Sequence, residues 1–192
     1  MLLAAGSSTR LGKPKQLLTF NGKSLLRHSI EVAAGANIQA LITVLGGNAD
    51  LLMPEIDSNN TLVVINKSWK DGMASSIIAG LTALLEKYRD TERVIFLMCD
   101  QPFVTTSLLN NLLDTEQQTG KSIVASIYDG VMGVPALFYK SHFKELLQLQ
   151  GDTGARKIIQ QHINEVATLL FTKGKVDIDT AEDYENLLKE PE

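Results

Sequence analysis

The stretch LAAGSSTRLGKPKQLL, residues 3–18, joins a short apolar run to a loop of small residues that carries the cations Arg10, Lys13 and Lys15. Small side chains let backbone N–H groups approach anionic oxygens, and such a loop can form an anion-binding nest. Arg10 can fork onto two oxygens, while Lys15 adds a mobile point charge. The stretch therefore predicts a phosphate-binding loop after a first strand, with a solvated surface loop as the alternative.

Two common phosphate motifs are excluded by spacing. A P-loop has four residues between its glycines, followed by Lys and Ser or Thr. Here five residues separate Gly6 from Gly12, and Lys13 is followed by Pro14. The G-x-G-x-x-G dinucleotide fingerprint is absent as well.

Length and composition describe an ordinary globular chain. The 192 residues predict one domain, residues 1–192, and the net charge is −4 with 44% hydrophobic and 21% charged residues. This balance excludes disorder and gives no electrostatic footprint for nucleic acid. The one cysteine excludes an internal disulfide framework, and no apolar run reaches the roughly 18 residues of a membrane span. We expect a cytoplasmic protein without nucleic-acid or membrane partners, and the abrupt start inside a strand suggests missing upstream residues.

Apolar strand-like runs alternate with helical patterns along the chain. Strands are expected at Leu2–Ala5, Leu41–Leu45, Leu62–Ile65, Val94–Met98, Ile123–Ile127, Ala136–Tyr139 and Val166–Phe171. Helices are expected at Ser24–Ala34, Ser75–Lys87, Thr106–Gln118, His142–Leu149, Gly154–His162 and Asp183–Lys189. The alternation predicts an α/β fold, a three-layer α/β/α arrangement with a mostly parallel, Rossmann-like sheet. Ligands of such sheets bind beyond the carboxyl ends of the strands.

An acid follows the strand expected to be central. Asp100 comes directly after the buried run Val94–Met98, and Pro102 turns the chain. A carboxylate here suits Mg²⁺, which takes one or two protein carboxylates and completes its shell with water and phosphate oxygens. The alternative is a helix cap, which Thr105 could provide as well. Cys99 should face away from Asp100 and is expected to be a buried core thiol.

A second acidic cluster lies near the end of the chain. Asp177 and Asp179 point to the same side if the segment is extended, so they could approach a cation held by Asp100. Alternatively, Asp179 or Thr180 caps the last helix. We favour Asp177 slightly over Asp179 as the second metal ligand. The three histidines, His28, His142 and His162, have no metal-ligand spacing and are expected to be ordinary core or surface residues.

The pattern L-A-A-G-x-S-x-R-x-G-x-x-K in residues 3–15 resembles the signature of the MobA-like NTP transferase family, the nucleotidyltransferases related to the molybdenum cofactor enzymes. L-A-A-G is similar to the cytidylyltransferase (MocA-like) branch, whereas the guanylyltransferase branch usually has L-A-G-G. The resemblance implies that Arg10 and Lys15 bind the triphosphate, with Lys15 steadying the α-phosphate. The other nucleotide-binding residues implied in this loop are Leu3, Ala4, Ala5, Gly6, Ser7 and Ser8.

Three further motifs extend the resemblance over nearly the whole chain. Asp100-Gln101-Pro102 matches the family's metal-binding D-Q-P, and residues 177–183 are similar to D-x-D-T-P-E-D, with Ala181 in place of proline. Asn66, Gly72 and Ser75 lie in a segment that resembles a nucleotide-contacting loop, although a plain helix start is the alternative.

The acceptor side departs from the family pattern. Relatives commonly have G-H-P where this chain has Gly133-Val134-Pro135, so the identity of the acceptor is open. Asp152 and Arg156 resemble the family's G-D-x-G-A-R and suit either an anionic acceptor or a plain capped helix. Together the resemblances imply acceptor-binding roles for Gly133, Pro135, Asp152 and Arg156.

The combined expectation is a nucleotidyltransferase that uses Mg²⁺, or alternatively Mn²⁺. The resemblance implies transfer of CMP from CTP to a phosphate-bearing acceptor, the molybdopterin cofactor, with release of pyrophosphate and a molybdenum hydroxylase as an eventual partner. Lys15, Arg10 and Asp100 would be the catalytic residues, and the metal ligands would be Asp100, Asp177 and Asp179. The alternatives are a guanylyltransferase or a sugar- or polyol-phosphate nucleotidyltransferase of the same fold, a glycosyltransferase, and a non-catalytic accessory protein for hydroxylase maturation.

Overall fold

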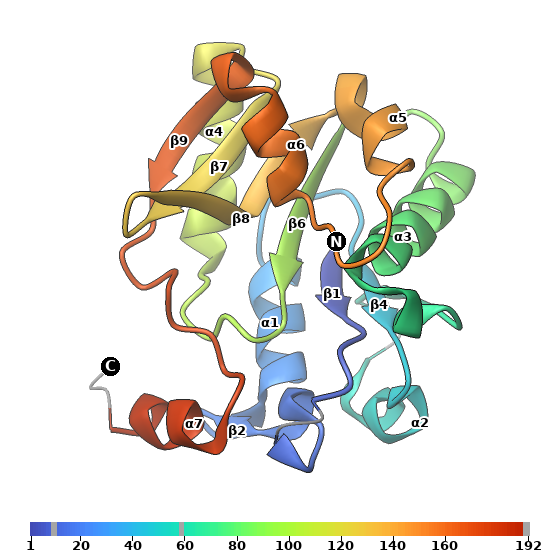
Figure 1. Cartoon of the computed structure of the whole chain (residues 1–192), viewed down its shortest axis with the longest axis vertical. Helices are drawn as coiled ribbons and strands as arrows, with labels where there is room; N and C mark the ends of the chain where they lie inside the picture. Colours follow the sequence, from blue (N-terminus) through green and yellow to red (C-terminus); the bar gives the residue numbers. More distant parts are fainter. Residues whose placement is uncertain (9–10, 58–59, 190–192) are drawn as a thin grey trace.

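The computed structural model describes residues 1–8, 11–57 and 60–189, which form a seven-stranded sheet with helices on both faces (Figure 1). The strand order in the sheet is β5-β4-β1-β6-β8-β7-β9. These strands are β1 (Leu2–Ala4), β4 (Ile42–Leu45), β5 (Leu62–Ile65), β6 (Arg93–Met98), β7 (Ile123–Tyr128), β8 (Val131–Tyr139) and β9 (Val166–Leu170). A separate hairpin pairs β2 (Thr19–Phe20) with β3 (Lys23–Ser24).

The helices lie largely where the sequence predicts them. They are α1 (Leu25–Ala34), α2 (Ala49–Leu52), α3 (Met73–Lys87), α4 (Thr106–Thr119), α5 (Phe143–Leu146), α6 (Arg156–Gln161) and α7 (Ala181–Leu187). Within the described ranges, none of them has the length and apolar character that crossing a bilayer requires.

The sheet is mostly parallel, and β8 is its exception. Parallel pairs join β5, β4, β1 and β6, and another joins β7 to β9, whereas β8 runs antiparallel to both β6 and β7. The predicted α/β class with a mostly parallel sheet is confirmed. The predicted start of β8 at Ala136 is wrong, because the strand already begins at Val131. Gly133 and Pro135, which weaken a strand pattern in sequence, are accommodated inside it.

Each face of the sheet carries its own apolar core. In β6, Ile95 and Leu97 pack with α1 and α4, while Val94 and Phe96 pack with α3, α5 and α6. Side chains alternate across a strand, so a strand buried on both faces reads as one continuous apolar run. This explains why the sequence alone identified β6 as central.

The hairpin β2–β3 was not predicted, although Asn21 and Gly22 give a signal for it. Both turn residues have positive φ, 49° and 77°, as a two-residue hairpin turn requires. The strands are two residues long, which is too short for an alternating pattern to be visible. The hairpin leads directly into α1, whose predicted cap is confirmed, because Ser24 Oγ accepts a hydrogen bond from the Arg27 N–H at 3.2 Å.

Candidate active site

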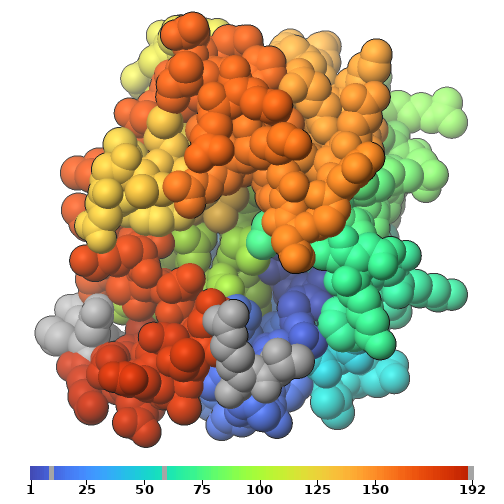
Figure 2. Space-filling view, in the orientation of Figure 1, coloured from blue at the N-terminus to red at the C-terminus, as the bar shows by residue number. Residues whose placement is uncertain are grey.

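The carboxyl ends of the parallel strands gather three segments that are far apart in sequence. The loop after β1, the turn after β6 and the segment before α7 meet at the lower end of the sheet in Figure 1. Their contact is direct, because the Ile178 N–H donates to the Asp100 carbonyl at 3.2 Å. In Figure 2 the red C-terminal segment lies beside the blue N-terminal one at this end. The topology therefore brings the glycine-rich loop, Asp100 and the segment with Asp177 and Asp179 to one edge.

A buried glutamine shapes the glycine-rich loop. Gln16 is 1% exposed, and its amide donates to the carbonyls of Ala4 at 2.9 Å and Gly6 at 2.8 Å. Ser8 has a φ of 54°, and its Oγ accepts a hydrogen bond from the Lys15 N–H at 2.9 Å. These bonds fold the loop back on itself and bring Lys15 over the strand end. Sequence reasoning missed Gln16, whose partners are backbone carbonyls distant from it along the chain.

Lys15 lies between two of the three predicted metal ligands. Its Nζ is 2.5 Å from Asp100 Oδ2 and 2.9 Å from Asp179 Oδ1. Burial of Lys15 opposes its charge, but the charges and hydrogen bonds of the two carboxylates outweigh that effect and raise its pKa above the usual value. The structure thus places the Lys15 ammonium between carboxylates that the sequence predicts to bind a metal ion. The predicted Arg10 lies outside the described residues.

Asp177 faces the same group of charges. Burial raises the pKa of its carboxyl, and the nearby negative charges of Asp100 and Asp179 raise it further. Three carboxylates around a single ammonium leave excess negative charge. Hard oxygen donors of this kind fit Mg²⁺ or Mn²⁺, so the residues present suit the metal that we expected. Direct contact with Lys15 is made by Asp179, whereas Asp177 interacts through its charge.

Asp100 and Asp179, the two proposed metal ligands that could instead cap a helix, do not do so. Thr105 caps α4, because its side chain accepts from the Leu108 N–H at 3.1 Å. Thr180 caps α7 in a capping box with Asp183, whose carboxylate accepts from the Thr180 N–H at 2.7 Å. The capping alternatives for Asp100 and Asp179 are therefore wrong, and the one for Thr180 is confirmed.

The first residues of the predicted nucleotide loop belong to the core. The side chains of Leu3 and Ala4 pack on opposite faces of the sheet and are 6% and 3% exposed. Ala5 is buried too, and its carbonyl lies so close to Gly46 that a Cβ there would meet it at 2.3 Å. These residues position the loop, while Gly6, Ser7 and Ser8 lie beyond the strand end and are exposed or half-buried.

Asn66, Gly72 and Ser75 form an internally bonded turn. Buried Asn66 donates through Nδ2 to Ser75 Oγ at 2.8 Å, and Ser75 Oγ donates to the Gly72 carbonyl at 2.8 Å. Gly72 has a φ of 93°, and a Cβ there would meet Gly151 backbone at 2.4 Å. The turn joins the loop after β5 to the loop before α6. The hydrogen bonds of Asn66 and Ser75 fix the turn that leads into α3.

Two of the predicted acceptor residues, Gly133 and Arg156, lie near Tyr128. A Cβ on Gly133 would meet the Tyr128 hydroxyl at 2.4 Å, and Gln101 Nε2 donates to the Val134 carbonyl at 3.1 Å, next to Pro135. Burial raises the pKa of the Tyr128 hydroxyl, the charge of Arg156 opposes this, and the charge of Asp177 adds to it. The charges of Arg156 and Asp177 therefore both influence the pKa of Tyr128. Asp152 is exposed.

Cys99 is the buried thiol that the sequence predicts. It is 3% exposed within the core beneath α1, and burial raises its pKa to about 12. A raised pKa keeps the thiol protonated at neutral pH, as suits a side chain packed in the core.

Two of the three histidines lie in one cluster with a glutamate, whereas His28 lies apart from them. His142 and His162 lie close together with Glu145 at the opposite edge of the sheet, although the chain separates them by about twenty residues. Tertiary folding alone brings them together, so the spacing gave no signal. His28 follows the expectation and hydrogen-bonds the Pro102 carbonyl at 2.9 Å.

Comparisons with known proteins find relatives that match nearly the whole chain. The chain is 26% identical to the nicotine blue oxidoreductase of Paenarthrobacter nicotinovorans, over 98% of this chain and 95% of that protein. The crystal structure of Rv0371c from Mycobacterium tuberculosis H37Rv has a TM-score of 0.85 and 31% identity, covering 98% of this chain and 95% of the other. A structure of Rv0371c in complex with manganese has a TM-score of 0.80 and 29% identity, covering 99% and 97%.

The family assignment rests on a match that covers most of the chain. Residues 1–166 match the model of the MobA-like NTP transferase domain, a span that includes the glycine-rich loop, Asp100 and the region around Tyr128. The chain belongs to the MobA-like NTP transferase family, as the motifs of its sequence implied.

Proposed function

We propose that the chain, as a single domain of residues 1–192, transfers CMP from CTP to a phosphate-bearing acceptor, the molybdopterin cofactor, and releases pyrophosphate in a Mg²⁺-dependent reaction. One observation carries the proposal. The Lys15 ammonium lies between Asp100 and Asp179 at the carboxyl edge of the sheet, so a cation, its carboxylates and a phosphate-binding loop share one place. This edge is the one at which sheets of this type bind their ligands.

The reaction requires little covalent help from the protein. An acceptor phosphate oxygen attacks the α-phosphorus of the nucleotide, and the bond from that phosphorus to the β-phosphate oxygen breaks with its electron pair leaving on pyrophosphate. Catalysis then consists of in-line placement and neutralisation of charge. An acceptor phosphate is already ionised, so a general base is unnecessary, which suits a site built from lysine and carboxylates.

The roles follow from position. Backbone N–H groups of Gly6, Ser7 and Ser8 would bind phosphate oxygens, with Arg10 and Lys15 covering the triphosphate. Asp100 with Asp177 or Asp179 would hold Mg²⁺, with Mn²⁺ as the alternative, and the ion would neutralise charge on the phosphates. The ion would take over the carboxylates that now bind Lys15, so the Lys15 ammonium would be available to the α-phosphate.

The acceptor would lie between this cluster and the start of α6. Gly133 and Pro135 lie in β8, Asp152 lies in the loop before α6, and Arg156 is the first residue of α6. Arg156 acts on Tyr128 together with Asp177, which supports a cationic group for an anionic acceptor near the metal ligands. Delivery of the product to a molybdenum hydroxylase is the partner that this substrate implies.

A second chemistry is suggested by a relative's name. The protein from Paenarthrobacter nicotinovorans is called an oxidoreductase, whereas this chain lacks the dinucleotide fingerprint and carries a carboxylate cluster suited to phosphates. The transferase is therefore the function that the site supports best. A guanylyltransferase, a sugar- or polyol-phosphate transferase and a non-catalytic accessory role remain as outcomes of the test.

The test measures pyrophosphate release with Mg²⁺ and each nucleoside triphosphate, in the presence of molybdopterin cofactor, a sugar phosphate or a polyol phosphate. Reduction of nicotine blue is assayed in parallel. We expect the fastest release with CTP and the molybdopterin cofactor. Faster release with GTP or another acceptor would replace the proposed substrates. No release with any pair would overturn the transferase function.

A further inference from the structure

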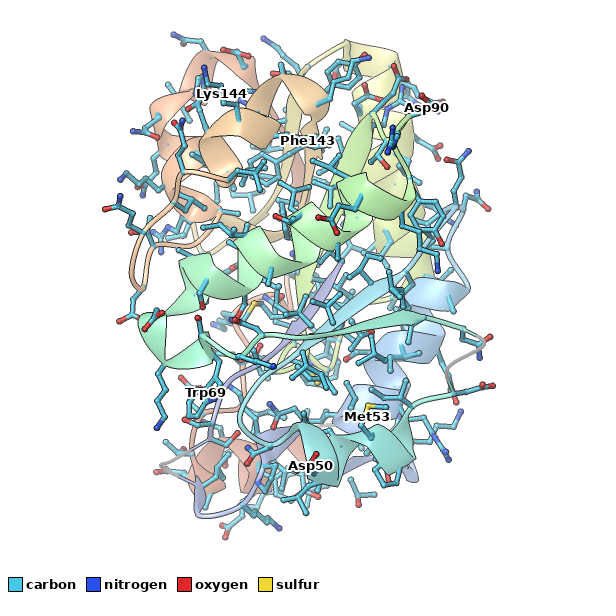
Figure 3. The ribbon with its side chains drawn as sticks, turned by 90° about the vertical axis from the view of Figure 1, so that its right-hand side faces the viewer. Asp50, Met53, Trp69, Asp90, Phe143 and Lys144 are labelled. Carbon is cyan, nitrogen blue, oxygen red and sulfur yellow. The ribbon has the colours of Figure 1, made fainter. Side chains whose placement is uncertain are left out.

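A second polar cluster lies at the amino edge of the sheet, remote from the candidate active site. It combines His142 at the end of the turn after β8, Glu145 on α5 and His162 after α6. Figure 3 shows the neighbouring Phe143 and Lys144 at one end of the molecule and Trp69, beside the carboxyl edge, toward the other. The cluster is therefore independent of the proposed transferase.

The three side chains are close enough to share one ion. One potential ligand atom from each lies within 4.8 Å of the others. His162 Nε2 is 2.9 Å from Glu145 Oε2, and the two imidazole centroids are 4.7 Å apart. Two imidazoles and one carboxylate form a ligand set that catalytic zinc sites use, with a fourth position open to water.

Hydrogen bonds determine the tautomer of His142. Ser122 Oγ donates its single proton to Glu165 Oε2 at 2.7 Å, since that carboxylate can only accept. Ser122 must therefore accept from His142 Nε2, which lies 2.8 Å away. The proton of the neutral imidazole is on Nε2, and Nδ1 carries a lone pair.

That lone pair has nothing to bind among the residues that the structure describes. His142 is 2% exposed, and its Nδ1 is buried without a hydrogen-bond partner. Buried polar atoms are rarely left without a partner, so the lone pair of His142 Nδ1 calls for a metal ion or a hydrogen-bond donor. Metal-binding histidines characteristically donate their other ring N–H to a fixed acceptor, which Ser122 is here.

Glu165 completes the arrangement as an orienting carboxylate. It accepts from Ser122 and lies 3.1 Å from His162 Nδ1, so one side chain fixes both imidazoles. This leaves His162 Nε2 facing Glu145. We propose that His142, His162 and Glu145 bind Zn²⁺, with water as the fourth ligand, at a site that fastens α5 and α6 to the amino ends of β7 and β9. Imidazole ligands favour Zn²⁺ over Mg²⁺, which separates this site from the carboxylate cluster.

The test titrates the purified full chain with Zn²⁺ by calorimetry, with the visible spectrum of Co²⁺ as a second readout. We expect one equivalent bound, a tetrahedral Co²⁺ spectrum and a higher Tm. Glu145→Gln and His162→Gln should each weaken Zn²⁺ binding at least 100-fold, and Ser122→Ala should weaken it about 10- to 100-fold by freeing His142. Circular dichroism checks that each variant is folded.

Two matched variants locate the ion. Glu92→Gln removes an exposed carboxylate that pairs with Lys140 at the same edge, and Asp100→Asn alters the other cluster. Both should retain the first equivalent of Zn²⁺ with unchanged affinity. The proposal is overturned if the wild-type chain binds no Zn²⁺ saturably, or if Glu145→Gln and His162→Gln bind it as tightly as wild type. It is also overturned if Asp100→Asn abolishes the binding.

Discussion

The two edges of one sheet carry two differently built polar clusters. At the carboxyl edge, Lys15 lies among carboxylates from loops that follow parallel strands. At the amino edge, two imidazoles and Glu145 meet. They do so because β8 is antiparallel to β6, so the turn after β8 lies at the amino ends of the parallel strands. Strand polarity thus decides which side chains can meet. The first cluster offers oxygen ligands suited to Mg²⁺, and the second offers the nitrogen ligands that Zn²⁺ accepts.

The largest expected effect removes a ligand from the carboxyl edge. Asp100→Asn keeps the size of the side chain but removes the charge that Lys15 and the metal require, so kcat for pyrophosphate release should fall at least about 1,000-fold. Steady-state kinetics measures this. Asp114→Asn, an exposed carboxylate on α4, serves as the matched control and should be unaffected. Turnover near wild type in Asp100→Asn would remove Asp100 from the site.

Removing the cation from the same cluster should have the next largest effect. Lys15→Gln takes away the ammonium proposed for the α-phosphate and should lower kcat/KM about 100-fold. Lys13→Gln is the control, because Lys13 lies two residues away, exposed over the Tyr184 ring. Equal losses in both variants would mean that general positive charge, rather than the position of Lys15, supports activity.

The contact between the loop after β5 and the loop before α6 is tested at Gly72. Gly72→Ala adds a Cβ that meets Gly151 backbone at 2.4 Å, with φ at 93°, and should destabilise the fold by about 2 kcal/mol. Gly120→Ala also has a positive φ but open space around it, so it should cost about 1 kcal/mol. Urea denaturation measures both, and equal costs would show that the close contact is unimportant.

Much of the fold was predictable from local pattern. The strands β1, β4, β5, β6 and β7 begin and end within a residue of the sequence prediction, because each contains a short, mainly apolar run that stands out in the sequence. The direction of β8 was not predictable, since strand pairing depends on contacts distant in sequence. The two-residue hairpin strands and the four-residue α2 are shorter than any periodic pattern.

The candidate site divides in the same way. Lys15, Asp100 and Asp179 were identifiable because acids and cations after strand ends converge in this fold class. Gln16 was not identified, because its role depends on carbonyls that only the folded loop presents. The pairing of His142 with His162 needed the antiparallel course of β8. Local sequence thus predicted the carboxyl edge better than the amino edge.

A smaller effect is expected at the helix cap beside Asp179. Thr180→Ala removes the side chain that accepts from the Asp183 N–H at 3.2 Å, and should cost about 1 kcal/mol of stability. Loosening this turn should also reduce the precision with which Asp179 is held. Thermal unfolding and kcat measured on the same sample separate the two effects. An unchanged Tm would show that the capping box does not stabilise α7.

The smallest effect on turnover is expected next to Asp100. Cys99→Ala replaces a buried thiol with a smaller apolar side chain, so stability should fall by about 1 kcal/mol while kcat stays at the wild-type value. Chemical denaturation and pyrophosphate release provide the two numbers. Loss of turnover in a stably folded Cys99→Ala would give this thiol a function that its burial argues against.

The most direct test of the carboxyl-edge site is a crystal structure of the chain with Mn²⁺ and CTP, using anomalous scattering to locate manganese. The account predicts a manganese peak about 2.1 Å from an Asp100 carboxylate oxygen, within reach of Asp177 or Asp179, with Lys15 Nζ on a phosphate oxygen. A manganese peak remote from Asp100, or Lys15 still bound to Asp100 and Asp179 with CTP in place, would contradict it.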